Sequence, residues 1–410
     1  MTELLSISAI VESGLCIGCG LCRSIAPANL EIVLNELGSE IPHEFAALDE
    51  SQLALINRVC PGLHVEGRSP DSGTPETRWD DLWGPAIFIA KAYSSDPDIR
   101  FRGSSAGAVS SLAIHLLETG QVDFVAHVAA SRTQPMRTEA QLSVTRSDVL
   151  RATGSRYSPA APLVDFVQLL DRRQPFAVIA KPCDISAIQN LSHFDPRVDE
   201  FVKCRITFFC GGPSAYSKST DLIASFGLRE DEVSLLRFRG YGNPGRVRLE
   251  TWDGRAFEVT HNDLWRDEGA WRVPFRCKIC GDATGEMADV AISDSWTGGG
   301  PVGEDAGFCG LVARTSRGAK LVAEAIEANV LTITQEWDFR DIDAVQPSQI
   351  RKKQAVTSRL SAMKHTGLPT THYEGLRLEE IASTATEEYR RANFDGMLQR
   401  LARRKPIEPD

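Results

Sequence analysis

The 410-residue sequence contains no long hydrophobic run. Its longest apolar stretches, such as residues 86–90 and 176–180, hold only five residues, whereas a helix that spans a bilayer needs about 20. The N-terminus also lacks the basic segment and apolar stretch of a secretory signal peptide. The sequence therefore predicts a protein with no membrane span, and we expect a cytoplasmic, reducing location.

Positive charge is in deficit as well. Lys and Arg number 45 against 55 Asp and Glu, so the net charge is −10, which excludes a whole-surface attraction for nucleic acid. Hydrophobic residues (42%) and charged residues (24%) have globular proportions, which excludes wholesale disorder. At about 150 residues per domain, the length predicts two or three domains.

The ten cysteines are too scattered for a disulfide scaffold. Structural disulfides are rare in a reducing compartment, so we expect metal ligands, reactive thiols or small buried side chains. The eight histidines show no HExxH motif and no paired metal spacing. A zinc hydrolase is therefore not expected.

Composition divides the chain into segments. Residues 66–78 are rich in Gly, Ser, Pro and Thr and lack apolar periodicity, which predicts a linker after a small cysteine-bearing module at residues 1–65. Beyond it, strand-like runs alternate with helical periodicity, which is typical of an α/β fold. We expect a mixed α/β core in two parts, residues 79–160 and 161–345, and a helical tail at residues 346–410.

Within this core, three strands are predicted at residues 122–128, 176–180 and 206–209. Helices are expected from Ser105 to about Gly120 and at residues 184–190 and 214–226, because apolar side chains recur there at helical spacing. Asp253-Gly254 between two alternating runs predicts an antiparallel hairpin insertion. Cys183 and Cys210 come just after strands, where open α/β sheets bind ligands.

The first cysteine cluster reads CxxCxxC at Cys16, Cys19 and Cys22. Bacterial ferredoxins present three thiolates of one loop to a cubane cluster with this run, and a distal Cys-Pro completes the set. Cys60-Pro61 supplies that pair, whereas Ala26 replaces the cysteine that would serve a second ferredoxin cluster. We therefore predict one 4Fe-4S cluster on Cys16, Cys19, Cys22 and Cys60, with a zinc knuckle as the alternative.

The second cluster, Cys277 and Cys280, is a lone CxxC. By itself this spacing fits zinc, a redox dithiol or an iron–sulfur site. Cys183 and Cys210 are candidate partners, and Cys204 and Cys309 remain as spares or buried side chains.

Several further motifs occur in a fixed order along the chain. They are FRGSSAG at residues 101–107, GSRY at 154–157, KPCD at 181–184, FCGG at 209–212, CKICGD at 277–282 and DSW at 294–296. This ordered set resembles the coenzyme F420 hydrogenase/dehydrogenase beta-subunit family, which includes 7-hydroxymethyl chlorophyll a reductases and ferredoxin-dependent 8-vinyl reductases.

The resemblance implies an iron–sulfur flavoprotein oxidoreductase with a ferredoxin-like N-terminal module and an FAD-binding core. It implies a second 4Fe-4S cluster on Cys183, Cys210, Cys277 and Cys280. Electrons would pass from ferredoxin or a similar carrier through both clusters to FAD, and on to a small organic substrate as hydride.

The resemblance also implies the FAD contacts. The matching positions are Arg102, Ser104, Ser105, Ala106, Gly107, Gly154, Ser155, Arg156, Tyr157 and Lys181. Independently, hydroxyls and a glycine before a predicted helix are suited to a phosphate, because helix N-termini attract anions. An ordinary serine N-cap is the alternative.

Two other classes of protein stay open. One is a non-catalytic electron-transfer beta subunit that serves a partner subunit in a larger hydrogenase or dehydrogenase, and it could reduce a deazaflavin coenzyme. The other is a zinc-stapled binding protein. The sequence identifies neither the organic substrate nor a catalytic proton donor.

Overall fold

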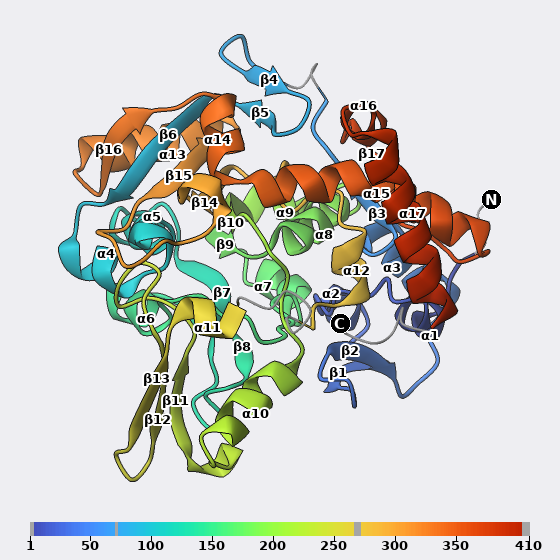
Figure 1. Cartoon of the computed structure of the whole chain (residues 1–410), viewed down its shortest axis with the longest axis horizontal. Coiled ribbons are helices and arrows are strands. Elements are labelled where there is room, and N and C mark those ends of the chain that lie inside the picture. The colour runs from blue at the N-terminus through green and yellow to red at the C-terminus, as the bar shows by residue number, and fades with distance from the viewer. Residues whose placement is uncertain (1–3, 70–72, 266–271, 404–410) are drawn as a thin grey trace.

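The computed structural model describes residues 4–69, 73–265 and 272–403 (Figure 1). Parts of the predicted N-terminal module, linker and C-terminal tail, at residues 1–3, 70–72 and 404–410, lie outside these ranges. Among the described residues, the helices are all too short or too polar to cross a membrane.

The centre of the molecule is an eight-stranded mixed sheet in the order β16-β6-β15-β14-β10-β9-β7-β8. The four middle strands, β14, β10, β9 and β7, run parallel, and antiparallel strands flank them on both sides. The strands are β6 (Phe88–Ser94), β7 (Phe124–Ala130), β8 (Thr138–Ser143), β9 (Phe176–Ile179), β10 (Val202–Phe208), β14 (Val290–Asp294), β15 (Cys309–Ala313) and β16 (Leu331–Glu336). All three predicted strands are therefore confirmed in place, and parallel β9 and β10 end just before Cys183 and Cys210.

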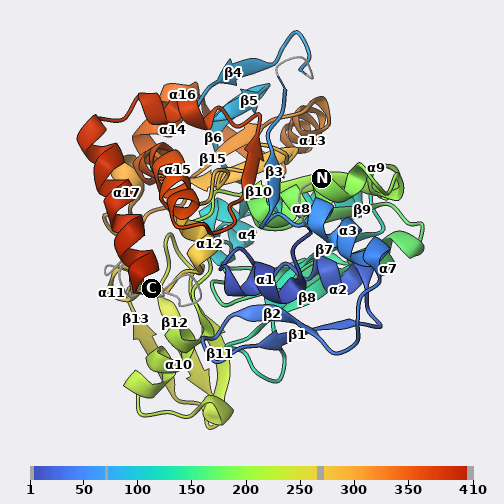
Figure 2. The ribbon, with the colours of Figure 1, turned by 90° about the vertical axis from the view of Figure 1, so that its right-hand side faces the viewer.

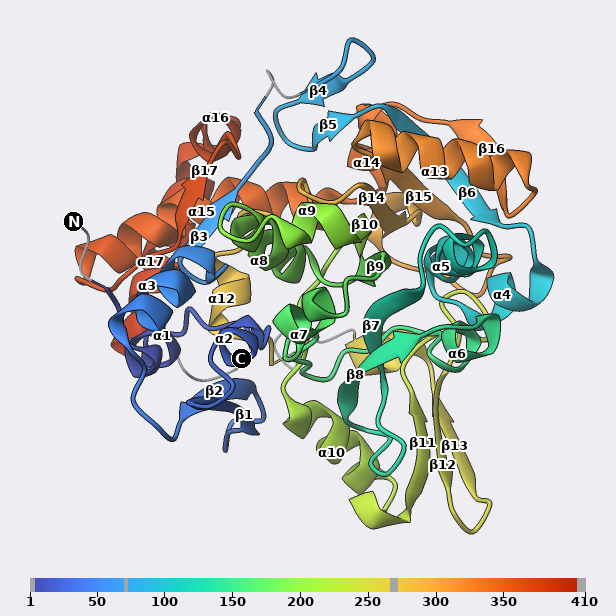
Figure 3. The same cartoon turned by 180° about the vertical axis from the view of Figure 1, so that it is seen from behind.

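Helices cover both faces of this sheet, so its middle strands bury apolar side chains on both faces. In β14, Val290 and Ile292 pack in one apolar cluster with α5 (Ala108–Glu118) and α13 (Ser316–Glu327). Ala291 faces the other way, toward Trp83 and α14 (Phe339–Val345). Side chains that alternate between two buried faces are typical of parallel strands. Figure 3 shows α5, α7 (Phe166–Asp171), α8 (Pro182–Ser192) and α9 (Arg197–Phe201) from behind.

The antiparallel insertion is confirmed. It is a three-stranded sheet of β11 (Val233–Arg237), β12 (Val247–Thr251) and β13 (Ala256–Val259). Side chains of this sheet form an apolar cluster with α10 (Tyr216–Ser225). Figure 1 shows it projecting below the main sheet, with α11 (His261–Trp265) at its upper end.

The N-terminal segment is built of short elements. They are α1 (Ile7–Glu12), α2 (Leu21–Ile25), the hairpin β1–β2 (Leu30–Leu34 and Glu40–Glu44), α3 (Glu50–Val59) and β3 (His64–Glu66). This segment shares a core with the rest of the chain, because Cys19, Leu21 and Val59 pack in the apolar cluster of α7, α8 and β9. The predicted linker therefore does not keep the N-terminal segment away from the sheet.

The C-terminal region consists of separate helices. They are α15 (Pro347–His365), α16 (Leu378–Ser383) and α17 (Glu387–Ala402), with β17 (His372–Glu374) between α15 and α16. Ala362, Met363 and Met397 from this region pack against Ile10 and Leu15. Figure 2 shows the C-terminal helices beside the N-terminal segment, so the two end regions of the chain form one side of the molecule.

The remaining elements are short connections. They are β4 (Arg78–Asp80), β5 (Gly84–Ala86), α4 (Pro97–Arg102), α6 (Arg146–Arg151) and α12 (Phe275–Lys278).

Candidate redox site

The first four cysteines lie around one small cavity. Cys16, Cys19, Cys22 and Cys60 line a space of about 30 Å³ together with apolar residues such as Ile10 and Val59. Cys16 and Cys19 come from the loop that leads into α2, Cys22 lies in the first turn of α2, and Cys60 caps the end of α3. The structure thus brings together the four side chains that the spacing predicts to act as one ligand set.

Two glycines shape the loop that carries these thiols. Gly18 and Gly20 have φ of 68° and 85°, in the left-handed region that favours glycine. A Cβ on Gly18 would lie 2.4 Å from the carbonyl oxygen of Glu40, and one on Gly20 would lie 2.9 Å from the amide nitrogen of Val164. The CxxCxxC loop therefore depends on glycine between its cysteines.

The environment of this set favours a bound cation. Burial and then the neighbouring Cys60 raise the pKa of Cys16 to about 12. Burial, Cys16 and Cys60 likewise raise the pKa of Cys22. Four thiols around one small cavity, each with little exposure to water, can all ionise only when a positive group compensates their charge. This donor set fits a metal cluster.

The second set of four cysteines gathers at the carboxyl edge of the sheet. Cys183 follows β9 and Cys210 follows β10, while Cys277 and Cys280 come from α12 and the turn after it. Their thiols are close enough to affect one another: Cys280 raises the pKa of Cys183, Cys210 and Cys277, after burial as the main cause. A Cβ on Gly212 would lie 3.4 Å from the Cys277 sulfur. Cys183 and Cys210 therefore lie near the CxxC pair.

A lysine faces this second set. Lys352 on α15 is half-buried, and its charge acts on all four thiols. Burial and then Cys210 and Cys280 set the pKa of Cys277 at about 12, against the opposing charge of Lys352. A cation at this position stabilises a ligand set that carries net negative charge.

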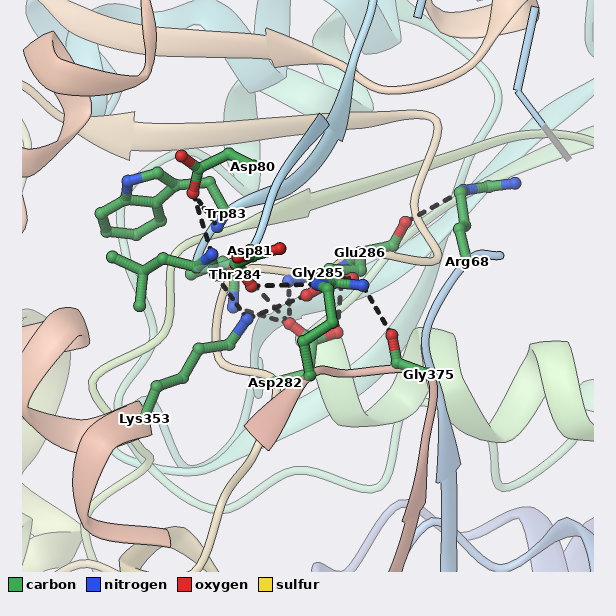
Figure 4. Close-up of polar contacts among 12 residues, drawn as sticks. Arg68, Asp80, Asp81, Trp83, Asp282, Thr284, Gly285, Glu286, Lys353 and Gly375 are labelled. Carbon is green, nitrogen blue, oxygen red and sulfur yellow. Dashed lines mark hydrogen bonds and ion pairs between the residues drawn. The ribbon is translucent and has the colours of Figure 1, made fainter. Parts of the chain in front are cut away.

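The loop after Cys280 is held by a buried ion network (Figure 4). The fully buried Glu286 carboxylate pairs with Lys353 Nζ at 2.8 Å and with an Arg377 nitrogen at 2.7 Å. Burial opposes its ionisation, but these two cations hold the pKa of Glu286 below its usual value. Asp282 accepts hydrogen bonds from the backbone amides of residues 284–286 at 2.7–3.0 Å. The network thereby fixes the CxxC loop against α15.

Charged side chains lie between the two cysteine sets. Arg276 is 2% exposed, donates to the Pro61 carbonyl at 3.0 Å and interacts with Cys60 as well as with Cys277 and Cys280. Lys181 pairs with Asp184 at 2.8 Å, and the Asp184 charge reaches Cys19 of the first set. The two sets are therefore neighbours that share these charged groups.

Cys204 and Cys309 belong to neither set. Both are buried in the apolar cluster of the main sheet, in β10 and β15 respectively. The Cys309 thiol donates to the Ala92 carbonyl at 3.3 Å. These two cysteines are core side chains.

The predicted phosphate segment forms an unusual turn. Ser105, Ala106 and Gly107 all have positive φ, of 46°, 58° and 72°, directly before α5. Gly107 caps α5 without a side-chain acceptor, so the helix N-terminus keeps the polarity that attracts an anion. The predicted capping by Ser105 does not occur; its hydroxyl instead donates to Asp294 at 2.8 Å.

The other predicted FAD residues divide into two groups. Ser155 donates its backbone amide to the Ser104 hydroxyl at 2.9 Å, so the loop at Gly154 lies against the turn. Arg156 and Lys181 have other partners, as does Arg102. The Arg156 guanidinium donates to the carbonyls of Pro135, Arg137 and Leu236, Lys181 pairs with Asp184, and the exposed Arg102 pairs with Asp98 at 2.8 Å. These three cations therefore already have partners within the protein.

Tyr157 lies in an aromatic cluster beside this turn. Its ring centroid is 4.5 Å from that of Trp265 and 5.7 Å from that of Phe238. In this arrangement its ring supports the insertion sheet.

Sequence reasoning missed three side chains that converge on the same turn. Arg239 is 4% exposed and holds Asp294 with two hydrogen bonds of 2.9 and 3.0 Å. Its guanidinium lies 4.7 Å from the centre of the Trp296 ring, and the His261 ring lies 5.9 Å from Trp296. Burial and then Arg239 lower the pKa of His261 to about 4. The DSW motif was the only sequence signal for this group.

These three side chains have unused polar atoms. Arg239 Nε, His261 Nδ1 and Trp296 Nε1 are buried, and none has a hydrogen-bond partner among the residues that the structure describes. Buried polar atoms are rarely left unpaired. The arrangement of a helix N-terminus, an aromatic ring and unpaired donors fits a bound aromatic cofactor with phosphates.

Strand register places this group beside the second cysteine set. Phe208 of β10 pairs with Ile292 of β14, so Cys210 and Asp294 each lie two residues beyond the same rung. Gln346 and Gln349 at the start of α15 donate to the Asp294 and Cys210 carbonyls, at 2.8 and 3.2 Å. The sheet edge thus presents the two candidate sites side by side.

The chain combines a mixed α/β sheet with two sets of four cysteines. The two regions of the family described as "Coenzyme F420 hydrogenase/dehydrogenase, beta subunit" both match the chain, the N-terminal region at residues 89–168 and the C-terminal region at residues 174–338. Together they cover more than half of the chain. The protein belongs to the coenzyme F420 hydrogenase/dehydrogenase beta-subunit family, which confirms the resemblance.

Curated relatives agree with this assignment. An uncharacterised protein of Methanocaldococcus jannaschii is 23% identical over 83% of this chain and 94% of its own length. The coenzyme F420 hydrogenase subunit beta of Methanothermobacter thermautotrophicus is 23% identical over 69% of this chain and 97% of its own. The F420-dependent formate dehydrogenase 1 subunit beta of Methanococcus maripaludis is 28% identical over 57% of each.

A solved structure shares the fold. A chain of the F420-reducing NiFe hydrogenase complex from Methanosarcina barkeri superposes with a TM-score of 0.53. It is 18% identical, and the match covers 72% of this chain and 98% of that one.

Proposed function

We propose that this protein is an iron–sulfur flavoprotein oxidoreductase that carries two 4Fe-4S clusters and one FAD. One observation carries the proposal: two sets of four cysteines lie next to each other, and the second borders a sheet edge with unpaired polar atoms. A path for electrons requires such closely spaced sites within one chain.

Each ligand set has its own residues. Cys16, Cys19, Cys22 and Cys60 would hold the first cluster, and Cys183, Cys210, Cys277 and Cys280 the second. Such clusters carry single electrons, and a flavin supplies the exchange between single electrons and hydride equivalents. Arg276 and Lys352 contribute positive charge that stabilises the more negative, reduced state of either set.

The FAD contacts are assigned to two regions. The turn at Ser104–Gly107 and the amide-rich start of α5 would bind phosphate. Trp296, His261 and Arg239 would lie against the ring system, because their unpaired polar atoms gather there. His261, held neutral by its environment, can donate or accept one hydrogen bond.

We infer that the electrons come from ferredoxin or a similar carrier and reduce a small organic substrate. The names of the relatives favour a second candidate, in which the chain is the beta subunit of a larger complex and exchanges electrons with coenzyme F420. The two candidates differ in whether one chain is sufficient for the whole reaction.

Reoxidation of the reduced protein distinguishes these candidates. The anaerobically purified holoprotein would be reduced with ferredoxin, and its visible spectrum followed under argon after adding coenzyme F420 or an organic acceptor. Reoxidation of the isolated chain by one of these compounds supports the proposal. A reduced spectrum that persists with every acceptor, together with reoxidation only after a co-purifying partner is restored, would contradict the stand-alone enzyme.

The flavin assignment has its own test. Trp296→Leu removes the ring and its unpaired nitrogen, so FAD content should fall at least tenfold with iron content unchanged. Trp252→Leu is the matched control, because Trp252 is 66% exposed on the insertion sheet. Gly107 is a poorer target, since any Cβ there would lie 2.5 Å from the Ile99 carbonyl oxygen and break the turn itself. Equal FAD in both tryptophan variants would contradict the assignment.

A further inference from the structure

A small parallel strand pair carries chemistry that the redox proposal does not use. β3 and β17 pair with His64 opposite His372, Val65 opposite Tyr373, and Glu66 opposite Glu374. Side chains alternate along strands, so the histidines and glutamates share one face. Figures 1 and 3 show the pair where the N-terminal segment meets the C-terminal helices.

The opposite face of this pair is buried and leads to the second cysteine set. Val65 is 2% exposed, and the Tyr373 hydroxyl donates to the Ile279 carbonyl and accepts from the Gly281 amide. Ile279 and Gly281 flank Cys280. The register is thereby fixed, because a slip by one residue would bury the charged side chains.

On the outer face, two imidazoles lie directly against each other. The rings of His64 and His372 are stacked with centroids 5.4 Å apart and an interplanar angle of 18°. A nitrogen from each ring and a carboxylate oxygen of Glu374 all lie within 4.8 Å of one another. Beside them, Glu66 and His193 form a pair at 2.8 Å.

We propose that His64, His372 and Glu374 bind one divalent transition-metal ion, with zinc as the representative. Two imidazoles and one carboxylate form a ligand set that zinc uses, with a coordination position left for water. The set is chemically distinct from the thiolate sets, because imidazole and carboxylate are harder ligands than thiolate. This site does not depend on the proposed redox function.

The position of the site indicates what the ion does. The His64 amide donates to the Cys60 carbonyl at 2.9 Å, and Asn190 on α8 donates to the His64 carbonyl at 2.9 Å. β17 comes from the C-terminal region of the chain. A pair of three-residue strands is weak by itself, so the ion fastens the C-terminal helices to the segment that carries Cys60.

Sequence spacing gave no indication of this site, because its ligands are far apart in the chain and meet only through strand pairing. The sequence itself has no paired histidine spacing, and His64 and His372 become neighbours only in the folded chain.

X-ray absorption at the zinc edge tests the proposal on the intact, cluster-loaded protein. Holoprotein would be equilibrated with Zn²⁺ under argon, desalted, and compared with His372→Gln and with His43→Gln, an exposed histidine in β2. We expect one zinc per chain with nitrogen and oxygen ligands at about 2.0–2.1 Å. Zinc affinity should fall about a hundredfold or more in His372→Gln and stay unchanged in His43→Gln.

Three results would overturn the site. They are no zinc retained by the wild type, a sulfur shell at about 2.3 Å that shows zinc on the cysteine sets, or equal zinc content in wild type and a folded His372→Gln protein. Glu374→Gln gives a second, independent loss of one ligand if His372→Gln does not fold.

Discussion

The turn before α5 concentrates backbone strain in two residues that are not glycine. Ser105 and Ala106 have φ of 46° and 58°, and a non-glycine residue in this region costs roughly 1–2 kcal/mol. Such strain is often found where a ligand is held. Here it orients the start of α5 toward the sheet edge that carries Asp294.

Ala106→Gly should therefore raise the free energy of unfolding, by about 0.5–1 kcal/mol, because glycine adopts positive φ freely at a smaller entropic cost. Urea unfolding under argon measures this free energy of unfolding. Ala108→Gly is the matched control: Ala108 has φ of −58°, so glycine there should lower stability by about 0.5–1 kcal/mol. The account of strain is wrong if both variants shift stability in the same direction.

Single charges near the second cysteine set should tune its potential. Lys352→Gln removes a cation that acts on all four thiols. We expect the midpoint potential of one cluster to become more negative, on the order of 50–100 mV, since reduction adds negative charge there. Lys320→Gln, on the exposed surface of α13, should leave it unchanged. A redox titration followed by EPR spectroscopy measures the midpoint potential of both variants. An unchanged potential in Lys352→Gln would show that the charge of Lys352 does not act on the cluster.

Between elements, the clearest junction joins α15 to the loop after Cys280. Glu286 is fully buried between Lys353, itself 3% exposed, and Arg377. Glu286→Gln leaves the buried Lys353 and the partly exposed Arg377 without their counter-charge, so we expect a loss of about 3 kcal/mol of stability. The exposed pair Lys320–Glu324 provides the control, and Glu324→Gln should cost less than about 0.5 kcal/mol. Equal thermal shifts in the two variants would show that the network does not hold the loop.

The sequence predicted those elements whose signal is local. β9 is a short apolar run with turn residues after it, β10 was predicted only from its end at residues 206–208, and the β12–β13 hairpin has its Asp253-Gly254 turn. The sequence did not predict the antiparallel strands β6, β15 and β16 or the β3–β17 pair, because they depend on partners far away in the chain. α15 carries no sharp apolar stripe, since its faces contact several different elements.

The candidate site divides in the same way. Cysteine spacing predicted that Cys16, Cys19 and Cys22 lie together, and the strand ends predicted the places of Cys183 and Cys210. Arg239 and His261 could not be found from the sequence, because Arg239 comes from the connection between β11 and β12 and His261 from α11. They reach Asp294 and Trp296, respectively, only after the insertion folds over the sheet edge. Arg156, expected at a phosphate, instead binds main-chain carbonyls.

At the scale of the whole molecule, the N-terminal segment is integrated with the sheet. The Leu163 amide donates to the Cys19 carbonyl at 2.9 Å, Arg23 pairs with Asp165, and Cys19 packs in the cluster of α7 and α8. We therefore expect that loss of a cluster from the first cysteine set would also destabilise the rest of the chain.

Cys19→Ser should remove about four iron atoms per chain and lower the thermal midpoint, while FAD content stays close to that of the wild type, because the turn at Ser105 lies at the sheet edge beside the second set. Cys309→Ser, a buried cysteine outside both sets, is the control and should keep its iron. Iron and flavin determination with calorimetry under argon measures both. Loss of iron from Cys309→Ser, or loss of all iron and flavin from Cys19→Ser, would contradict this arrangement.

The central claim is that one chain holds two cubane clusters on eight cysteines, and the most direct measurement is iron and acid-labile sulfide per chain in anaerobically purified protein. The account predicts about eight of each, because each cubane holds four iron and four sulfide. About four of each would show that only one of the two cysteine sets holds a cluster. A colourless protein that contains zinc but no iron would contradict it entirely.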